Sequence, residues 1–250
     1  MKNVIKISCR ISVLIGMFAI GAVIAADSQD PEQKLLGYWR FDEGSGSTVS
    51  DSSGSGMDGE IMNDMRAVEW VDGRNGKSAL KFSGAKEGNQ SGCVRIPKFN
   101  FDLRKGMTVM VWIKINQNAK AEDMYTIIGN QKDNMGPGFH FYFNCRNFML
   151  MSGDGNEMWR AIAPVSASTS FDKWLHLAGT YNGSEYVLYI NGEEVGKSET
   201  NKPFQNHFGE LYIGSSYRGA SYGFQGIIDE IKIYNYALSQ KEILSEAKLQ

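Results

Sequence analysis

Residues 41–60 read FDEGSGSTVSDSSGSGMDGE and combine five carboxylates with five glycines and six serines. Carboxylates and backbone carbonyls are the oxygen ligands that calcium takes, and glycine lets a loop turn tightly enough to bring them together. The stretch therefore predicts half of a calcium site, with Asp42, Asp51 and Asp58 as candidate ligands. Two alternatives stay open, namely carboxylates that cap backbone amides in tight turns, and a plain flexible linker.

The carboxylates of the chain do not show the spacing of a glycoside hydrolase. A retaining hydrolase needs two carboxyl groups about 5 to 5.5 Å apart, which on one strand means acids two or four positions apart. The chain has no Glu-x-Asp-x-Glu or Glu-x-Asp-x-x-Glu pattern, and the adjacent Asp229 and Glu230 face opposite sides of a strand. No catalytic residue is assigned, and the chain is predicted not to be an enzyme.

Aromatic residues set among polar ones are candidates for carbohydrate binding, because the C–H faces of sugars stack on rings and their hydroxyls need polar partners. The segment SSYRGASYG carries Tyr217, Arg218 and Tyr222 on a predicted loop, where no strand requires aromatic side chains. Trp159 follows the turn SGDGN and is predicted to form a second wall of the same site.

The segment FHFYFN offers a second candidate surface. Alternation along a strand places its phenylalanines on one face and His140, Tyr142 and Asn144 on the other. These side chains would line a concave surface if that face is exposed. The alternative is that they are ordinary strand residues under a covering layer.

Short apolar or alternating runs, separated by Gly, Asn, Asp and Ser, follow one another along the chain after residue 60. They predict a two-sheet antiparallel sandwich or jelly roll. The runs are ALKF, CVRI, MTVMVWIKI, YTIIGN, FHFYFN, FMLMS, WLHLAGTY, EYVLYI, ELYIG and IIDEIKIY. The Asn-Gly pairs at Asn182 and Asn191 predict turns, and a capping box from Ser239 to Glu242 predicts a short C-terminal helix.

The first 25 residues resemble an export signal, with Lys2, Lys6 and Arg10 ahead of a short apolar run and small residues before Ala26. An uncleaved anchor helix is the alternative, but the run is shorter than the roughly 20 residues of a membrane span. Signal removal changes the formal charge from −2 to −5, because residues 1–25 hold three basic and no acidic residues. An acidic chain argues against nucleic acid as partner, and no membrane insertion is predicted after cleavage.

Two cysteines, Cys93 and Cys145, remain after signal removal, in a compartment where a disulfide can persist. Strand alternation places Cys145 with the phenylalanines of FHFYFNC, whereas Cys93 lies opposite to Val94 and Ile96. Two thiols and a bridge both stay open, with two thiols favoured.

Five ordered blocks resemble the laminin-G-like (LamG-like) jelly-roll family of the concanavalin A-like lectin/glucanase superfamily. The blocks are LLGYWRFDEGSGSTVSDSSGSGMDGE, VDGRNGKSALKFSG, MTVMVWIKI, DKWLHLAGTYNGSEYVLYINGEEVG and FQGIIDEIKIYNYALSQKEI. The resemblance implies an all-β, two-sheet antiparallel sandwich over residues 35–250, after a signal peptide (1–25) and a short linker (26–34).

The resemblance also implies that the first and last strands lie side by side, which would bring Asp229 towards Asp42 and the loop from Asp51 to Asp58. Alternation places Asp229 on the apolar face with Ile231 and Ile233, where an ionised carboxylate needs a partner. Calcium is the predicted partner, and a cap on loop amides is the alternative.

A secreted, calcium-stabilised binding module for carbohydrate or a cell-surface ligand is the predicted function. Its predicted location is outside the cell, in the periplasm or on the cell surface. Two other functions stay open, because this fold serves many activities. One is a glycan-degrading enzyme whose carboxylates converge from separate strands, and the other is a purely adhesive matrix or wall component.

Overall fold

The computed structural model describes residues 33–62, 67–84, 91–119, 124–131, 136–144, 147–164, 171–216 and 222–248. Residues 33–250 form one compact unit. The predicted signal peptide and most of the predicted linker lie outside the described residues. Among the residues described, no helix is both long and apolar enough to cross a membrane.

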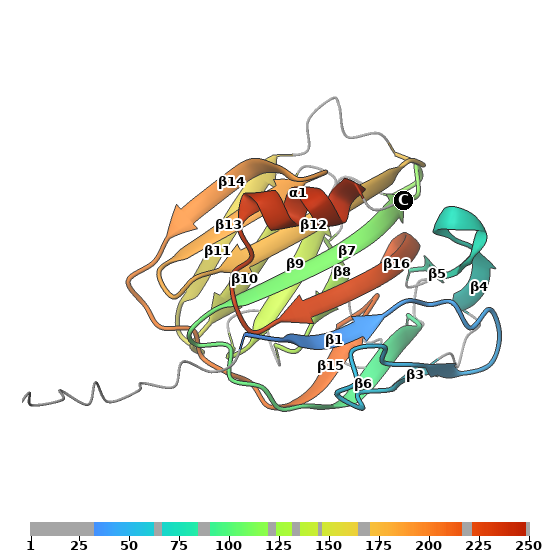
Figure 1. The fold of residues 1–250 in the computed structure, drawn as a ribbon, viewed down its shortest axis with the longest axis horizontal. Helices are drawn as coiled ribbons and strands as arrows, with labels where there is room; N and C mark the ends of the chain where they lie inside the picture. The colour runs from blue at the N-terminus through green and yellow to red at the C-terminus, as the bar shows by residue number, and fades with distance from the viewer. Residues whose placement is uncertain are drawn as a thin grey trace, which may run out of the picture. The chain divides into compact units, whose positions relative to one another are not determined.

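The described strands form two antiparallel sheets of eight strands each (Figure 1). Sheet A has the order β14-β13-β12-β7-β16-β5-β4, with β1 paired to β16. Its strands are β1 (Leu35–Trp39), β4 (Val68–Asp72), β5 (Ser78–Ser83), β7 (Met107–Ile115), β12 (Trp174–Tyr181), β13 (Glu185–Ile190), β14 (Glu193–Glu199) and β16 (Gln225–Tyr234).

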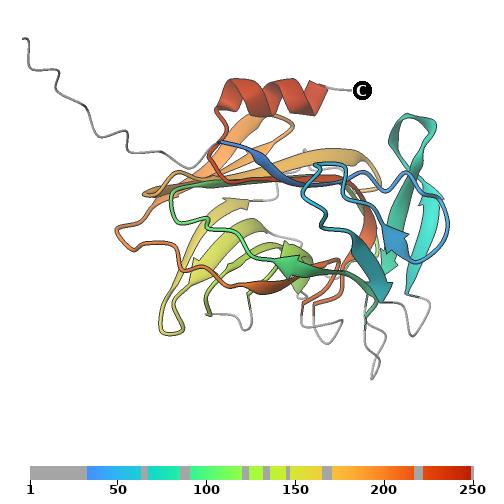
Figure 2. The ribbon, with the colours of Figure 1, turned by 60° about the horizontal axis from the view of Figure 1, so that its bottom comes forward.

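Sheet B has the order β11-β10-β9-β8-β15-β6-β3-β2. Its strands are β2 (Thr48–Val49), β3 (Gly59–Met62), β6 (Cys93–Phe99), β8 (Met124–Gly129), β9 (Phe139–Asn144), β10 (Asn147–Gly153), β11 (Met158–Pro164) and β15 (Gly209–Ile213). Figure 2 shows the two sheets as stacked layers. The predicted antiparallel sandwich is confirmed.

Side-chain alternation builds the core between the two sheets. In β9 of sheet B, Phe139, Phe141 and Phe143 are all fully buried. They share one core cluster with Val111 and Ile113 of β7 in sheet A. Burial of these apolar faces is the main stabilising contribution, at about 25 cal/mol per Å² of apolar surface.

The predicted turn at Asn191 and the predicted helix are both present. Asn191 (φ 53°) and Gly192 (φ 85°) form the two-residue turn between β13 and β14, where both positions need a positive φ. Helix α1 (Gln240–Lys248) begins after Ser239, whose N–H donates to the Glu242 carboxylate at 2.7 Å. Ile243 anchors this helix and is fully buried.

A β-bulge in β16 changes the face on which Asp229 lies. Asp229 pairs with Trp112 and Lys232 pairs with Met110, so Glu230 and Ile231 together lie opposite the single residue Val111. Strand β16 therefore holds one extra residue here, and Glu230 adopts a φ of 46°. Cross-strand partners point to the same side of a sheet, and Trp112 lies outside the core cluster between the sheets. The prediction that Asp229 shares the apolar face of Ile231 is therefore wrong.

Cys93 begins β6 and is fully buried. Cys145 lies outside the described residues. The choice between two thiols and a bridge therefore stays a prediction.

Candidate functional site

A pocket of about 620 Å³ lies where an edge of sheet A meets an edge of sheet B. Strand β14 ends sheet A and β11 ends sheet B. The two strands come so close that a Cβ atom on Gly196 would overlap the carbonyl oxygen of Ile162. The pocket is lined by Trp159, Asn182, Ser184, Glu185, Glu199, Thr200 and Asn201.

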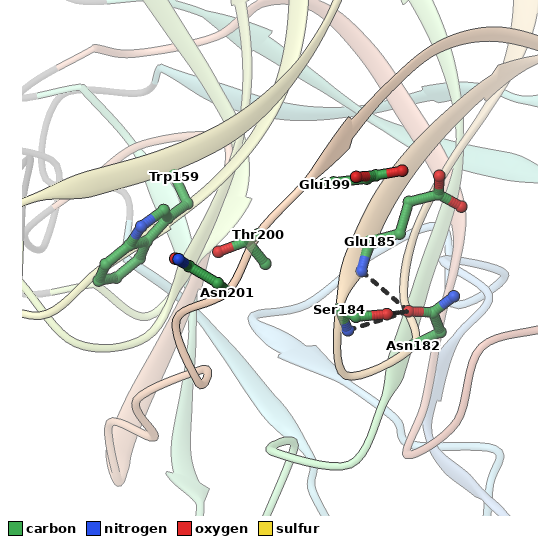
Figure 3. A pocket seen from close by; sticks show the side chains of 7 residues that line it. All are labelled: Trp159, Asn182, Ser184, Glu185, Glu199, Thr200 and Asn201. Carbon is green, nitrogen blue, oxygen red and sulfur yellow. Dashed lines mark hydrogen bonds between the residues drawn. The ribbon is translucent and has the colours of Figure 1, made fainter.

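Trp159 forms the aromatic wall of the pocket (Figure 3). Within β11 it shares a face with Ala161 and Ala163, which are fully buried in the core between the sheets. Trp159 is only partly buried and packs against that core. Figure 3 shows the side-chain amide of Asn201 beside the indole ring. The pocket thus presents an apolar ring and an amide side by side.

The turn between β12 and β13 forms the opposite wall. Asn182 Oδ1 accepts hydrogen bonds from the N–H groups of Ser184 (3.0 Å) and Glu185 (2.9 Å), which closes the turn (Figure 3). The N–H of Thr200 donates to the carbonyl of Ser184 at 2.7 Å and ties the end of β14 to this turn. Backbone bonds therefore hold this wall in place.

Two carboxylates face each other in the pocket. Glu185 and Glu199 are direct partners in the pairing of β13 with β14, and directly opposite residues have Cβ atoms about 4.5–5.5 Å apart. Lys197 Nζ lies 3.5 Å from the Glu185 carboxylate. Hydroxyl-rich ligands suit a pocket of this kind, because the ring can stack and the carboxylates and amides can exchange hydrogen bonds.

The face of sheet B that carries His140 and Tyr142 is not an exposed platform. Tyr142 is fully buried and His140 is 1% exposed, and Tyr142 Oη lies 2.7 Å from His140 Nδ1. Met149, Met151 and Tyr222 pack around Tyr142. Of the two alternatives for this face, an exposed surface and strand residues under a covering layer, the structure shows the second, because the side chains of Met149, Met151 and Tyr222 bury Tyr142. Burial lowers the pKa of His140 to about 3, so the imidazole is neutral at physiological pH.

Asn144 and Tyr222 have local structural contacts. Asn144 Oδ1 accepts the N–H of Asn147 at 2.8 Å in the turn between β9 and β10. The Tyr222 ring meets Tyr142 edge-on, with ring centroids 5.9 Å apart. Tyr217 and Arg218 lie outside the described residues.

The predicted pairing of Trp159 with Tyr222 in one site is wrong. Met158 packs in the same cluster as Tyr222, on the outer face of sheet B. Trp159 is the next residue of β11 and therefore points to the opposite face of that sheet. Of the predicted ligand residues that the structure describes, only Trp159 lines the pocket.

The other residues that line the pocket were not predicted. No strand is predicted for residues 158–164, which form β11, and a sequence pattern does not show that a strand lies at the edge of a sheet. The Asn-Gly pair at Asn182 did indicate a turn, but the pocket depends on that turn lying near Trp159, which is 23 positions away. Only the meeting of the two sheet edges brings them together.

The four predicted calcium ligands do not form one cluster. No group of three or more His, Cys, Asp or Glu residues suited to a metal ion occurs within the described ranges. Asp42 is paired with Arg40 (3.1 Å) and Lys77 (2.9 Å). Asp58 accepts the N–H of Asp51 at 2.8 Å. These four carboxylates therefore do not fit a common calcium site.

Asp51 instead organises the glycine-rich loop. Its carboxylate accepts the N–H groups of Tyr38 (3.0 Å), Ser53 (2.9 Å) and Met57 (3.0 Å). Partial burial alone would raise the pKa of Asp51, but these hydrogen bonds outweigh it and hold the pKa below its usual value. Asp51 in the stretch 41–60 thus caps backbone amides in tight turns, which was the alternative to the predicted calcium site.

Asp229 caps a different turn. Its Oδ2 accepts the N–H of Arg74 at 3.0 Å, and so holds the 3₁₀ turn η1 (Arg74–Gly76) against the bulge in β16. The Arg74 guanidinium stacks on Trp112, with Cζ 3.4 Å from the ring centroid. Burial raises the pKa of Asp229 to about 7. The hydrogen bond from the N–H of Arg74 opposes this rise most strongly, and the charge of Arg74 adds a smaller effect in the same direction.

Residues 87–244 match the model of a laminin G domain family in the concanavalin A-like lectin/glucanases superfamily. The chain belongs to this family. Human pappalysin-1 is 29% identical to this laminin G-like chain over 169 residues, which cover 57% of the chain and 10% of pappalysin-1. Mouse pappalysin-1 is 30% identical over 94 residues, or 35% of the chain and 6% of the relative. The chain thus spans a tenth or less of these curated relatives.

Solved structures share the fold of this laminin G-like chain at low sequence identity. Domain 4 of AbnA, a GH43 extracellular arabinanase from Geobacillus stearothermophilus solved with arabinotriose, has a TM-score of 0.63 and 22% identity, over 86% of this chain and 99% of that domain. The binding domain of botulinum neurotoxin DC, solved with SialylT, has a TM-score of 0.67 and 14% identity, over 86% of this chain and 50% of that one.

Proposed function

We propose that the chain is a secreted carbohydrate-binding module whose ligand lies in the pocket beside Trp159. The observation that carries this proposal is the combination of one partly buried indole with amide, hydroxyl and carboxylate side chains in a pocket of about 620 Å³. That size lies within the range of small-ligand sites, and the lining matches the mixed apolar and polar surface of a sugar.

The structural relatives support this proposal. The arabinanase domain was solved with arabinotriose. The match covers 99% of that domain, so the fold of this chain corresponds to the whole domain. The arabinanase is an extracellular protein, which agrees with the export signal predicted for residues 1–25. The proposed module acts outside the cell, in the periplasm or on the cell surface, through binding and not through catalysis.

Replacing Trp159 with leucine should weaken glycan binding five- to thirtyfold. This corresponds to about 1–2 kcal/mol, because leucine fills the buried side of the position but offers no ring for a sugar to stack on. The test is a glycan array followed by calorimetric titration of the best ligand. Asn201→Ala, at an exposed position, should also weaken binding without changing the melting temperature.

Trp174→Leu is the matched control, because Trp174 is also partly buried in a strand but lines no part of this pocket. Its glycan affinity should equal that of the unchanged chain. Equal affinities for Trp159→Leu and Trp174→Leu would contradict the assignment of the pocket.

Calcium stabilisation remains part of the proposal, although the four predicted aspartates do not supply a common site. Calcium at about 100 times its dissociation constant adds about 2.7 kcal/mol to the stability of a protein that binds it only when folded. Melting curves in calcium and in chelator should then differ by several degrees. Identical curves would remove calcium from the proposal.

Hydrolysis of a glycan is the second candidate function, favoured by the direct pairing of Glu185 with Glu199 in the pocket. Cross-strand partners can bring two carboxyl groups to the separation that retaining hydrolases use. If the chain is a hydrolase, it should release reducing ends from a polysaccharide, and the Glu199→Gln variant should no longer release them. Binding without release supports the non-catalytic module.

A further inference from the structure

A second pocket, of about 470 Å³, lies between the loop after β1 and the hairpin formed by β4, η1 and β5. Its loop side is formed by Asp42 and Gly44, in the first half of the glycine-rich stretch 41–60. The pocket is lined by Asp42, Gly44, Trp70, Val71, Asp72, Gly76, Lys77 and Ser78.

The indole of Trp70 is fixed in position before any ligand arrives. Its Nε1–H donates to the carbonyl of Gly46 at 2.9 Å, and the side chain packs partly buried against the core. In the pairing of β4 with β5, Trp70 lies opposite the fully buried Leu80. An aromatic ring held in this way offers stacking area at low cost in conformational entropy.

Charged side chains of both signs surround this ring. Lys77 Nζ lies 2.9 Å from Asp42 Oδ2, and the two side chains remain 47% and 33% exposed. Asp72 is exposed at the end of β4. Asp42 is already paired with Arg40 and Lys77, so the pocket does not offer the concentrated negative charge that a divalent cation needs. It offers donors and acceptors suited to neutral hydroxyls.

We propose that this second pocket binds one sugar residue of a glycan, so that the module has two separate glycan sites. The sugar stacks on Trp70, while Asp42, Asp72 and Lys77 exchange hydrogen bonds with its hydroxyls. The inference rests on the proposed function in taking a glycan as the ligand, but it concerns different residues.

The two pockets are too far apart to be subsites for one short oligosaccharide. The first pocket is built on β13 and β14, and the second on β4, at the opposite end of sheet A (Figure 1). Five steps between neighbouring strands separate β13 from β4, or roughly 24 Å at about 4.8 Å per step. A polysaccharide or two separate glycans can occupy both pockets, and the two contacts then combine as avidity.

The test is ¹⁹F NMR of the purified chain with 5-fluorotryptophan at its five tryptophan positions. Arabinotriose and 3′-sialyllactose are titrated separately, and Trp70→Phe and Trp159→Phe assign the two pocket signals. We expect the Trp70 signal to move saturably with at least one sugar. A Trp70 signal that stays fixed with both sugars overturns the inference. Movement of Trp70 without Trp159 supports the second site and contradicts the proposed first site, and movement of neither signal rejects both.

Substitutions at exposed positions distinguish a loss of ligand contact from a general change of the fold. Lys77→Ala and Asp72→Ala should each weaken the titration of the Trp70 signal at least fivefold and leave that of the Trp159 signal unchanged. Lys81→Ala is the control, because Lys81 is a partly exposed lysine of the neighbouring strand β5 that pairs with Glu69 and lines no part of the pocket. Equal titrations of the Trp70 signal in all three variants would overturn the inference.

Discussion

Alanine at position 129 is expected to lower the free energy of unfolding by about 3 kcal/mol, at the upper end of the usual cost of overpacking a core. Gly129 in β8 is the direct partner of His140 in β9, and a Cβ atom on it would overlap the imidazole ring. The ring has no room to move, because His140 is buried and its Nδ1 lies 2.7 Å from Tyr142 Oη. Urea denaturation of Gly129→Ala measures the loss.

His140→Ala supplies the control for this prediction. On its own it removes the hydrogen bond with Tyr142 and should destabilise the chain. In the double variant the space left by the imidazole receives the new methyl group. The loss of unfolding free energy in the double variant should therefore be smaller than the sum of the losses in the two single variants. Unchanged stability in Gly129→Ala would contradict the close approach of these two strands.

Acidification from pH 6.5 to 4.5 is expected to lower the free energy of unfolding by about 2 kcal/mol. Burial lowers the pKa of both His140 and His176 to about 3, and for His176 the charges of Arg74 and Lys232 lower it further. Between pH 6.5 and 3 the unfolded chain therefore binds two protons that the folded chain does not. Their contribution to stability is fully present above pH 6.5 and falls as the pH is lowered.

Asp229 has the opposite effect on the pH dependence and offsets the contribution of one of the two histidines. Burial raises its pKa to about 7 from an ordinary value of 3.8, so between these values the folded chain holds a proton that the unfolded chain has lost. This contribution grows as the pH falls from 7 to about 4. The unfolded chain then binds one proton more than the folded chain, so the free energy of unfolding falls by about 1.4 kcal/mol for each pH unit of acidification.

Urea denaturation at several pH values tests the acid dependence, with each variant compared with its own stability at pH 7. His140→Gln with His176→Gln should abolish the loss on acidification, and Asp229→Asn should make it about twice as steep. The same pH dependence in the double histidine variant and in the unchanged chain would contradict the prediction.

Local patterns in the sequence were enough to predict most elements of the fold. The alternation in residues 139–144 predicted a strand with its phenylalanines inward, and these three rings lie in the core. The Asn191-Gly192 pair predicted a tight turn, and the Ser239–Glu242 box predicted the start of the helix. Strand alternation, positive-φ turns and helix caps depend on neighbours within a few positions, so the sequence records them directly.

The candidate sites depend on contacts that no local pattern contains. The bulge at Glu230 places Asp229 on the outer face instead of the expected inner one, because counting alternate residues along the strand does not reveal a single inserted residue. Trp159 and Tyr222 were separated because they lie on opposite faces of sheet B.

Local patterns in the sequence thus predict the all-β sandwich, its inward-facing rings and the residue types able to contact a sugar. Which of those residues meet depends on the tertiary structure. Trp159 reaches Asn182 and Asn201 only because the edges of two different sheets come together, and Trp70 reaches Asp42 only because a loop folds against a hairpin. The physical reason is that strand faces are set by backbone geometry, whereas the meeting of distant segments is set by how the two sheets pack over their common core.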